Sequence, residues 1–225
     1  SASLVGSEMC IRDSYGARVV SILVPDRNGK REDVVCGFST ITEYMEQRQN
    51  FGSTVGRYIG RILNARFTLD GVEYKLVPNN GKSGHISHGG NPGFADRIWK
   101  VEQADTHRVC LSYLSPDGEN GFPGNLKVTL VYSLGEDDNA LDLTYEATTD
   151  APTVLNLSHH SFFNISGNFT KSVEDQQLWV DADRFTPYDD KKCVTGEYLP
   201  VAGTPLDFRM PHACLLYTSD AADEL

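Results

Sequence analysis

Residues 126–163 read LKVTLVYSLGEDDNALDLTYEATTDAPTVLNLSHHSFF, and this stretch decides the fold. Apolar residues take every second position in Leu126–Leu134 and again in Leu141–Ala147. That period places one side of a β-strand in a core. Gly, Asp, Asn and Pro residues, which favour turns, separate these two runs from Val154–Phe163. The stretch therefore predicts three antiparallel strands in a meander.

The third of these strands extends to Gly167, and its sequence VLNLSHHSFFNISG predicts two unlike faces. Alternation gives a mostly apolar face of Leu155, Leu157, His159, Ser161, Phe163 and Ile165, and a polar face of Asn156, Ser158, His160, Phe162 and Asn164. An imidazole titrates near neutral pH and can exchange a proton there. We predict that His160 faces a polar cleft; the alternative is a purely structural, hydrogen-bonded histidine.

Strand signals recur along the rest of the chain, while helix signals are scarce. Further strands are predicted at Ala17–Val24, Val34–Phe38, Trp99–Glu102, Arg108–Leu114 and Leu178–Ala182. Phe67–Leu76 is predicted to be a hairpin around Asp70-Gly71, which suits a tight turn. Thr40 and Glu43 form a capping-box pattern at the start of a short helix, 40–49. The chain is predicted to be all-β, a sandwich or a barrel.

Composition limits the possible functions. The chain has 225 residues and a net charge of −11, and such an acidic surface repels phosphate backbones. We therefore expect no nucleic-acid partner. No apolar run approaches membrane-spanning length, so we expect no membrane partner either. The five cysteines are widely spaced without a CxxC pair and are read as free thiols, without a disulfide framework or a zinc cage.

The two ends of the sequence differ from the rest. VGSEMCIRDS near the start and CLLYTSDAADE near the end resemble translated sequencing-adapter DNA. We expect residues 15–212 to be one partial domain, and residues 1–14 and 213–225 to be non-native segments excluded from fold reasoning. Ordinary tails are the alternative. The oligomeric state is left open, as is any targeting signal.

Six separated motifs together resemble the aldose 1-epimerase family. In chain order they are GRYIGRI with the DG hairpin after it, SHGG, GF with a later Trp, SPDGENGFPG, NLSHHSFFNISG and TGEYLPVAGTPLDFR. The resemblance covers nearly all of 15–211 and implies a large antiparallel β-supersandwich, truncated here at both ends. It also implies an isomerase that uses no metal or cofactor and interconverts the α and β anomers of free aldohexoses such as galactose and glucose.

The resemblance assigns roles to four residues. His160 matches the proton donor, and its neighbour His159, which replaces an asparagine usual in the family, is given a structural role. Arg61 and His88 match residues that contact the sugar, and Phe162 matches an aromatic residue at the sugar site. Gly60 stands where the family usually has asparagine, so one hydrogen-bonding side chain is missing.

The resemblance also implies a partner for His160 that we do not find. The family's base is a glutamate near the C-terminus, preceded by a sugar-binding aspartate, and both lie beyond the TPLDFR motif. Asp207 belongs to that motif and Glu224 lies in the adapter-like end, so neither is taken as the missing group. We therefore predict that the 225-residue chain is inactive or nearly so.

Three other interpretations of the sequence compete with this one. A non-catalytic sugar-binding or regulatory module on the same fold is the main alternative. A glycoside hydrolase needs two carboxylates flanking a cleft, and no motif supplies such a pair. The histidines His85, His88, His159 and His160 suggest zinc, but no further ligand completes a recognisable spacing. Members of the family are mostly cytoplasmic, which is the expected location.

Overall fold

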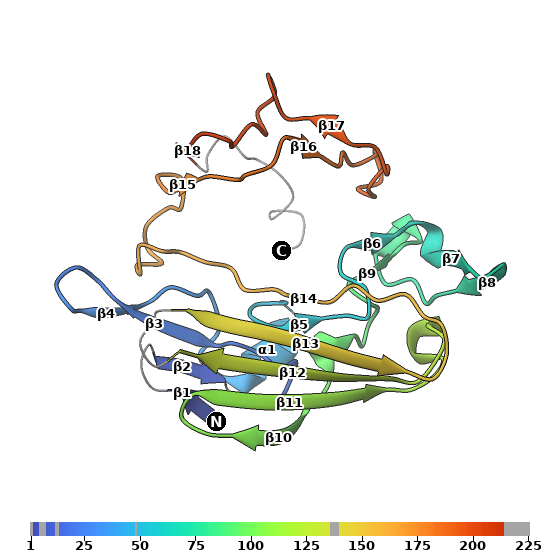
Figure 1. Cartoon of the computed structure of the whole chain (residues 1–225), viewed down its shortest axis with the longest axis horizontal. Coiled ribbons are helices and arrows are strands. Elements are labelled where there is room, and N and C mark those ends of the chain that lie inside the picture. Colours follow the sequence, from blue (N-terminus) through green and yellow to red (C-terminus); the bar gives the residue numbers. More distant parts are fainter. Residues whose placement is uncertain (1, 5–7, 12–13, 48, 136–139, 214–225) are drawn as a thin grey trace. The chain divides into compact units, whose positions relative to one another are not determined.

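The computed structural model describes residues 2–4, 8–11, 14–47, 49–135 and 140–213 (Figure 1). The chain forms two compact units, one up to Phe163 and one from Asn164 onward. Most of the turn predicted between Leu134 and Leu141 (residues 136–139) and the position of Glu224 lie outside the described residues.

Strands are the main regular elements of the first unit, and short strands joined by long loops form the second. The first unit contains β1 (Ala2–Leu4), β2 (Glu8–Ile11), β3 (Ser21–Pro25), β4 (Arg31–Asp33), α1 (Ile41–Gln47), β5 (Thr54–Val55), β6 (Arg61–Ile62), β7 (Arg66–Leu69), β8 (Val72–Lys75), β9 (Ile86–Ser87), β10 (Lys100–Ala104), β11 (Arg108–Ser115), β12 (Leu126–Leu134), β13 (Leu141–Thr149) and β14 (Ser158–His159). Its 3₁₀ turns are η1 (Leu63–Ala65), η2 (Gly81–Ser83), η3 (Phe94–Asp96) and η4 (Glu119–Gly121). The second unit contains β15 (Gln177–Leu178), β16 (Arg184–Phe185), β17 (Leu199–Pro200) and β18 (His212–Ala213).

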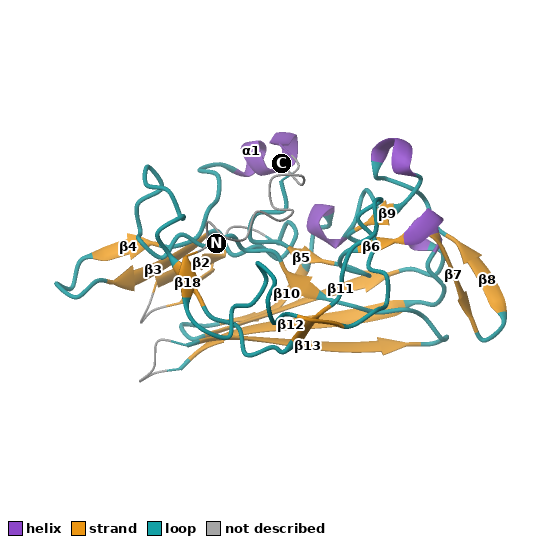
Figure 2. Ribbon diagram, turned by 90° about the horizontal axis from the view of Figure 1, so that it is seen from above, coloured by secondary structure: helices purple, strands orange, loops and turns teal. Residues whose placement is uncertain are grey.

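The antiparallel sheet β10-β11-β12-β13 forms the main layer (Figure 1 and Figure 2). The predicted alternation in β12 is confirmed, because Leu126, Val128, Leu130, Tyr132 and Leu134 are all buried. They pack with Trp99 and with Val109 and Leu111 of β11 in one apolar cluster. Burial of this kind is the main driving force for folding.

A second sheet, β1-β2-β3-β4, contributes to the same core. Ala17, Val19 and Val35, which flank its strands β3 and β4, lie in the apolar cluster with the residues of β11 and β12. Strands β1 and β2 fall within residues 1–14, and β2 pairs with β3. The expectation that these residues are non-native stays a prediction.

The prediction of a third meander strand is wrong, both in the partner of that strand and in its length. The segment after β13 leaves the sheet, and only β14 forms a ladder, with β5 (Figure 1). Isolated bridges join Asn156 to Tyr58 and Phe163 to Val35. The predicted alternation fails at the end of the segment, where Phe163 and Ile165 are exposed and Asn164 is buried. The reason is that Asn164 side-chain atoms bond to the turn at 166–171, so local polar bonds replace the strand pattern.

The local turn signals were more reliable than the short strands. The capping box is confirmed, since the Thr40 backbone N–H donates to Glu43 at 2.8 Å and the Glu43 N–H donates to Thr40 Oγ1 at 3.3 Å. The hairpin β7–β8 turns at Asp70-Gly71, both with positive φ. The strands predicted at 17–24, 34–38 and 178–182 are shorter or displaced: the ladders run over 21–25, 31–33 and 177–178.

Candidate functional site

Strand β14 presents His160 from a short ladder of backbone hydrogen bonds. Ser158 and His159 pair with β5. The ladder continues past the strand, because the His160 N–H donates to the Ser53 carbonyl at 2.8 Å and the Gly52 N–H donates to the His160 carbonyl at 3.0 Å. His160 is therefore fixed through both of its own backbone groups.

His88 is held by a second short ladder, β6–β9, in which Arg61 pairs with Ser87. The His88 N–H donates to the Gly60 carbonyl at 3.0 Å, and the Gly60 N–H donates to His88 Nδ1 at 3.2 Å. Because Nδ1 accepts a hydrogen bond, the neutral ring carries its proton on Nε2. The backbone thus fixes both the orientation and the tautomer of this side chain.

The two ladders bring together three of the four residues singled out in the sequence. The rings of His88 and His160 meet edge to face, with centroids 5.2 Å apart. The Phe162 ring lies 5.0 Å from that of His160. Phe162 also contacts Phe51 at 5.2 Å, so it joins His160 to an aromatic cluster. Arg61, the fourth residue, is half-buried and follows Gly60, whose backbone holds His88.

His159 points to the opposite side of β14, as alternation predicts. Its ring contacts the buried Tyr132 of β12 with centroids 5.9 Å apart. Burial lowers the pKa of His159 to about 4, with the neighbouring imidazole of His160 and the guanidinium of Arg18 lowering it further, against a hydrogen bond to Gly52 that raises it. His159 is therefore neutral at pH 7 and adds no charge beside His160.

The buried guanidinium of Arg57 holds the loop 115–124. Arg57 is 2% exposed, and it donates to the loop 115–124 and to Thr153. Its acceptors are Ser115 Oγ (2.9 Å) and the carbonyls of Ser115 (3.0 Å), Pro116 (2.9 Å), Pro123 (2.8 Å) and Gly124 (2.9 Å). Burial lowers the pKa of Arg57, and the carboxylates of Glu119 and Asp117 oppose this shift. Arg57 lies in the GRYIGRI motif, but no role was predicted for it.

The same loop carries a cluster around Glu119. This carboxylate forms an ion pair with Arg97 at 2.6 Å and accepts hydrogen bonds from Tyr113 at 2.7 Å and from Ser115. The following residue, Asn120, donates to the loop that carries His88. Sequence reasoning missed both residues, and the signal that could have indicated them is the run of turn-forming residues SPDGENGFPG.

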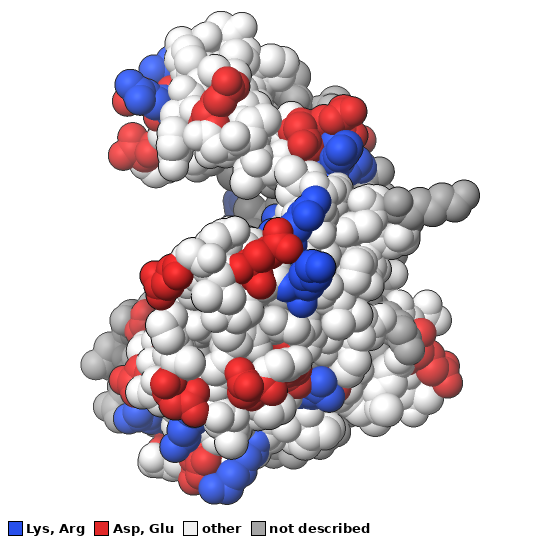
Figure 3. All heavy atoms as spheres, turned by 90° about the vertical axis from the view of Figure 1, so that its right-hand side faces the viewer, with Lys and Arg blue, Asp and Glu red and all other residues white. Residues whose placement is uncertain are grey.

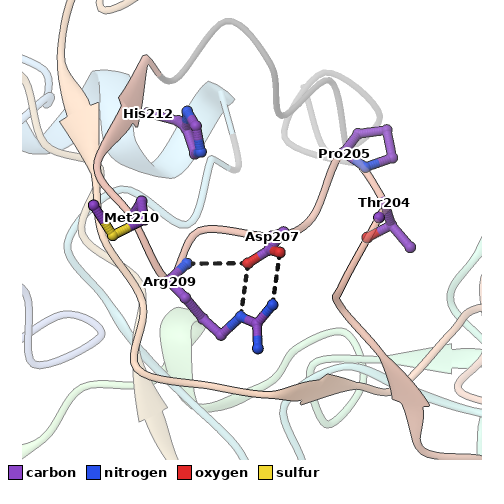
Figure 4. Close-up of a pocket in the computed structure, with 7 residues that line it drawn as sticks. Thr204, Pro205, Asp207, Arg209, Met210 and His212 are labelled. Carbon is purple, nitrogen blue, oxygen red and sulfur yellow. Dashed lines mark hydrogen bonds and ion pairs between the residues drawn. The ribbon is translucent and has the colours of Figure 1, made fainter.

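A pocket of the second unit contains Asp207 (Figure 4). Its volume is about 500 Å³ and its lining includes Thr204, Met210 and His212. Asp207 accepts two hydrogen bonds from the Arg209 guanidinium at 2.8 Å each, and this partner lowers the pKa of the carboxyl. Arg209 also pairs with Asp183 at 3.0 Å. Asp207 is thus held in an ion-pair network with Arg209 and Asp183.

Charge and metal-binding groups add little to the site. Acidic and basic side chains are interspersed on the face shown in Figure 3. Within the described ranges, no three His, Cys, Asp or Glu residues gather as metal ligands. In the same part of the chain, we find no helix with the length and apolar character needed to cross a bilayer.

Solved structures define the class of protein to which this architecture belongs. The GalM/aldose epimerase homologue from C. elegans superposes with a TM-score of 0.90 at 33% identity, covering 98% of this chain and 67% of that one. The galactose 1-epimerase from Lactobacillus acidophilus superposes with a TM-score of 0.78 at 28% identity, covering 96% and 66%. The fold is therefore the all-β galactose mutarotase-like sandwich.

Sequence comparison then gives the family. The chain belongs to the aldose 1-epimerase family, whose sequence model matches residues 9–216. It is 40% identical over 198 residues to galactose mutarotase of Sus scrofa, covering 88% of this chain and 56% of that protein. It is 35% identical over 195 residues to aldose 1-epimerase of Escherichia coli K12, covering 87% and 55%. The chain thus spans just over half the length of these relatives.

Proposed function

We propose that this protein is an aldose 1-epimerase that interconverts the α and β anomers of free aldohexoses, with galactose and glucose as substrates. The single observation that carries the proposal is the contact between His88 and His160, which come from ladders far apart in the sequence. Membership of the aldose 1-epimerase family supports the reaction class.

In the proposed mechanism, His160 protonates the ring oxygen of the sugar while a base takes the proton of the anomeric hydroxyl. The bond from C1 to the ring oxygen breaks, C1 becomes a carbonyl carbon, and rotation about C1–C2 presents its other face for ring closure. An imidazole is suited to the acid role because it exchanges protons near neutral pH. The base is not assigned to any described residue.

The other three residues are proposed to bind the sugar. His88, with its proton on Nε2, is a donor beside His160. Arg61 is a planar donor of several hydrogen bonds, which suits vicinal hydroxyls. Phe162 offers an aromatic surface next to His160. A cytoplasmic location, and a sugar rather than nucleic acid or a membrane as the binding partner, are part of the same proposal.

Polarimetry on freshly dissolved α-galactose tests the proposal. We expect the 225-residue chain to be nearly inactive. The coding region of the gene should be resequenced, and we expect the protein product encoded by it to accelerate mutarotation. In that product, His160→Asn should lower kcat by roughly 10²–10⁴-fold, the usual contribution of general acid–base catalysis. His107→Asn, in the loop between β10 and β11, is the matched control and should leave kcat unchanged.

Three outcomes would contradict the proposal or the role that it gives to His160. Galactose binding without mutarotation in either protein would favour the non-catalytic sugar-binding module. Release of monosaccharide from an oligosaccharide would favour a glycoside hydrolase. Equal kcat values for the His160→Asn variant and the unsubstituted protein would remove His160 from the acid role.

A further inference from the structure

His88 has a backbone conformation that needs support. Its φ is +50°, in the left-handed region that residues other than glycine seldom adopt. Such a conformation costs of order 1 kcal/mol or more and persists where neighbouring contacts enforce it. The contacts of the residues after His88 therefore decide how firmly its ring faces His160.

The two glycines that follow His88 are packed too closely to be replaced. Gly89 has φ +83°, and a Cβ atom there would lie 1.8 Å from the Gly56 carbonyl oxygen. A Cβ atom at Gly90 would lie 2.5 Å from Cγ of Asn120. The turn carrying His88 is thus pressed between the segment at Gly56 and the side chain of Asn120.

The Asn120 amide group spans this turn. Its Nδ2 donates to the Gly89 carbonyl at 2.9 Å and to the Pro92 carbonyl at 2.9 Å. The backbone carbonyl of Asn120 accepts a hydrogen bond from the Val77 N–H at 3.0 Å. One residue therefore connects the loop 115–124 to both ends of the segment that follows His88.

Asn120 is itself held in place by the framework around Arg57. It lies in η4, with φ +50°, which asparagine tolerates better than most residues. The loop on both sides of it is bonded to the buried Arg57 guanidinium, and Arg57 follows Gly56, against which Gly89 packs. The contacts thus form a closed ring from Arg57 through Asn120 and Gly89 back to Gly56.

We propose that Asn120 is a positioning residue, which holds the His88–Gly89 turn in its left-handed conformation and so aims the Nε2–H of His88 at the sugar. The identity of the ligand in this inference rests on the proposed function. The effect of Asn120 on His88 does not, because it is measured without sugar.

Two variants distinguish the effect of losing the Asn120 side-chain donor from an effect on folding. Asn120→Asp keeps the size of the side chain but replaces its donor with an oxygen facing two carbonyls. Asn120→Gly deletes the side chain and suits φ +50° without strain. Asn28→Asp, in the exposed turn between β3 and β4, adds the same charge elsewhere and is the control.

The first readout is the tautomer of His88 in the 225-residue chain, from long-range ¹H–¹⁵N correlation spectra. We expect separate ¹⁵N chemical shifts for His88 Nδ1 and Nε2 in the unsubstituted chain and in the control variant Asn28→Asp. Both Asn120 variants should show averaged ¹⁵N shifts, because the bond from Gly60 to Nδ1 is no longer enforced. Unchanged His88 shifts in the folded Asn120→Gly variant would overturn the proposal.

The second readout is galactose binding, followed by titration of the same spectra. Loss of the two hydrogen bonds should weaken binding by about tenfold in both Asn120 variants. If the unsubstituted chain binds no galactose, the proposed function is in question, while the His88 shifts still decide the role of Asn120. Averaged shifts with unchanged affinity would overturn the link between the turn and the sugar.

Discussion

The β10–β13 sheet and the loops around His88 and His160 are stabilised by different interactions. In the sheet, β12 pairs with β13 along its whole length and with β11 from Leu126 to Ser133, and the alternate residues Val128, Leu130 and Tyr132 are completely buried. Around the histidines, the ladders are two residues long, and polar side chains donate to backbone carbonyls. The sheet thus depends on apolar area, whereas the site depends on a few hydrogen-bond donors.

The difference matters because the two kinds of contact fail differently. Deleting apolar atoms from a core leaves a cavity that neighbours partly fill. Removing a buried donor leaves carbonyl groups without partners, and each costs about 1–3 kcal/mol. A single polar substitution can therefore displace the site while the sheet keeps its shape.

The largest expected effect follows from Arg57→Met, which removes every hydrogen bond from the guanidinium to the loop 115–124. We expect the free energy of unfolding to fall by about 3–5 kcal/mol, as measured by urea titration, because breaking a buried charged network is strongly destabilising. The imidazole signals of His88 and His160 should also move in the folded fraction.

Leu130→Ala is the matched control for that prediction. It should cost a similar amount, about 2–5 kcal/mol, through a cavity in the sheet core. The histidine signals should then stay where they are in the unsubstituted chain. If Leu130→Ala moves those signals as much as Arg57→Met does, the distinction between the two regions is wrong.

Sequence reasoning succeeded where one interaction dominates. The alternation of Leu126–Leu134 predicted the burial of β12, since a strand with one buried face has a period of two. The capping box and the Asp70-Gly71 turn were predicted because they depend only on neighbouring residues. His160 and His159 were assigned to opposite faces by the same alternation, and the contacts of their rings agree with it.

The same reasoning failed where contacts between residues far apart in the sequence determine the structure. The Val154–Phe163 segment has the pattern of a third sheet strand, yet it pairs with β5, and no local signal gives the partner of a strand. Arg57 and Asn120 lie in the motifs GRYIGRI and SPDGENGFPG, and the sequence assigned neither of them a role. Their roles depend on which carbonyls the fold places around them, and periodicity carries no information on that arrangement.

An effect of intermediate size is expected from protonation of His159. This residue links the two regions, because it lies in β14 and its ring packs against Tyr132 of β12. Its pKa is lowered in the folded chain from 6.5 to about 4, so the unfolded chain binds the proton more readily. The stabilisation is complete above pH 6.5 and is lost as pH falls toward 4, by up to roughly 3 kcal/mol.

Urea titrations at pH 7.5, 5.5 and 4.5 would measure this loss. His159→Asn should reduce the slope between pH 6.5 and 4, since asparagine does not titrate. His107→Asn should keep the slope of the unsubstituted chain. An unaltered slope in His159→Asn would show that His159 is accessible to protons in the folded state and is not held in the core.

The smallest effect is expected from Thr40→Ala at the start of α1. The substitution removes the cap on the Glu43 N–H and should cost about 1 kcal/mol in urea titration, as for other N-cap threonines. The helix should remain formed, because Tyr44 is buried and accepts the Phe38 N–H at 3.0 Å.

Thr40→Ala also tests how far the aromatic cluster transmits a disturbance. Tyr44 contacts Phe38, Phe38 contacts Phe51, and Phe51 contacts Phe162 beside His160. If polar donors fix the site, a weakened cap at the far end of this cluster should leave the His160 signals unchanged. A shift of those signals comparable to that in Arg57→Met would mean that apolar packing, too, positions His160, and the contrast between the two regions would have to be abandoned.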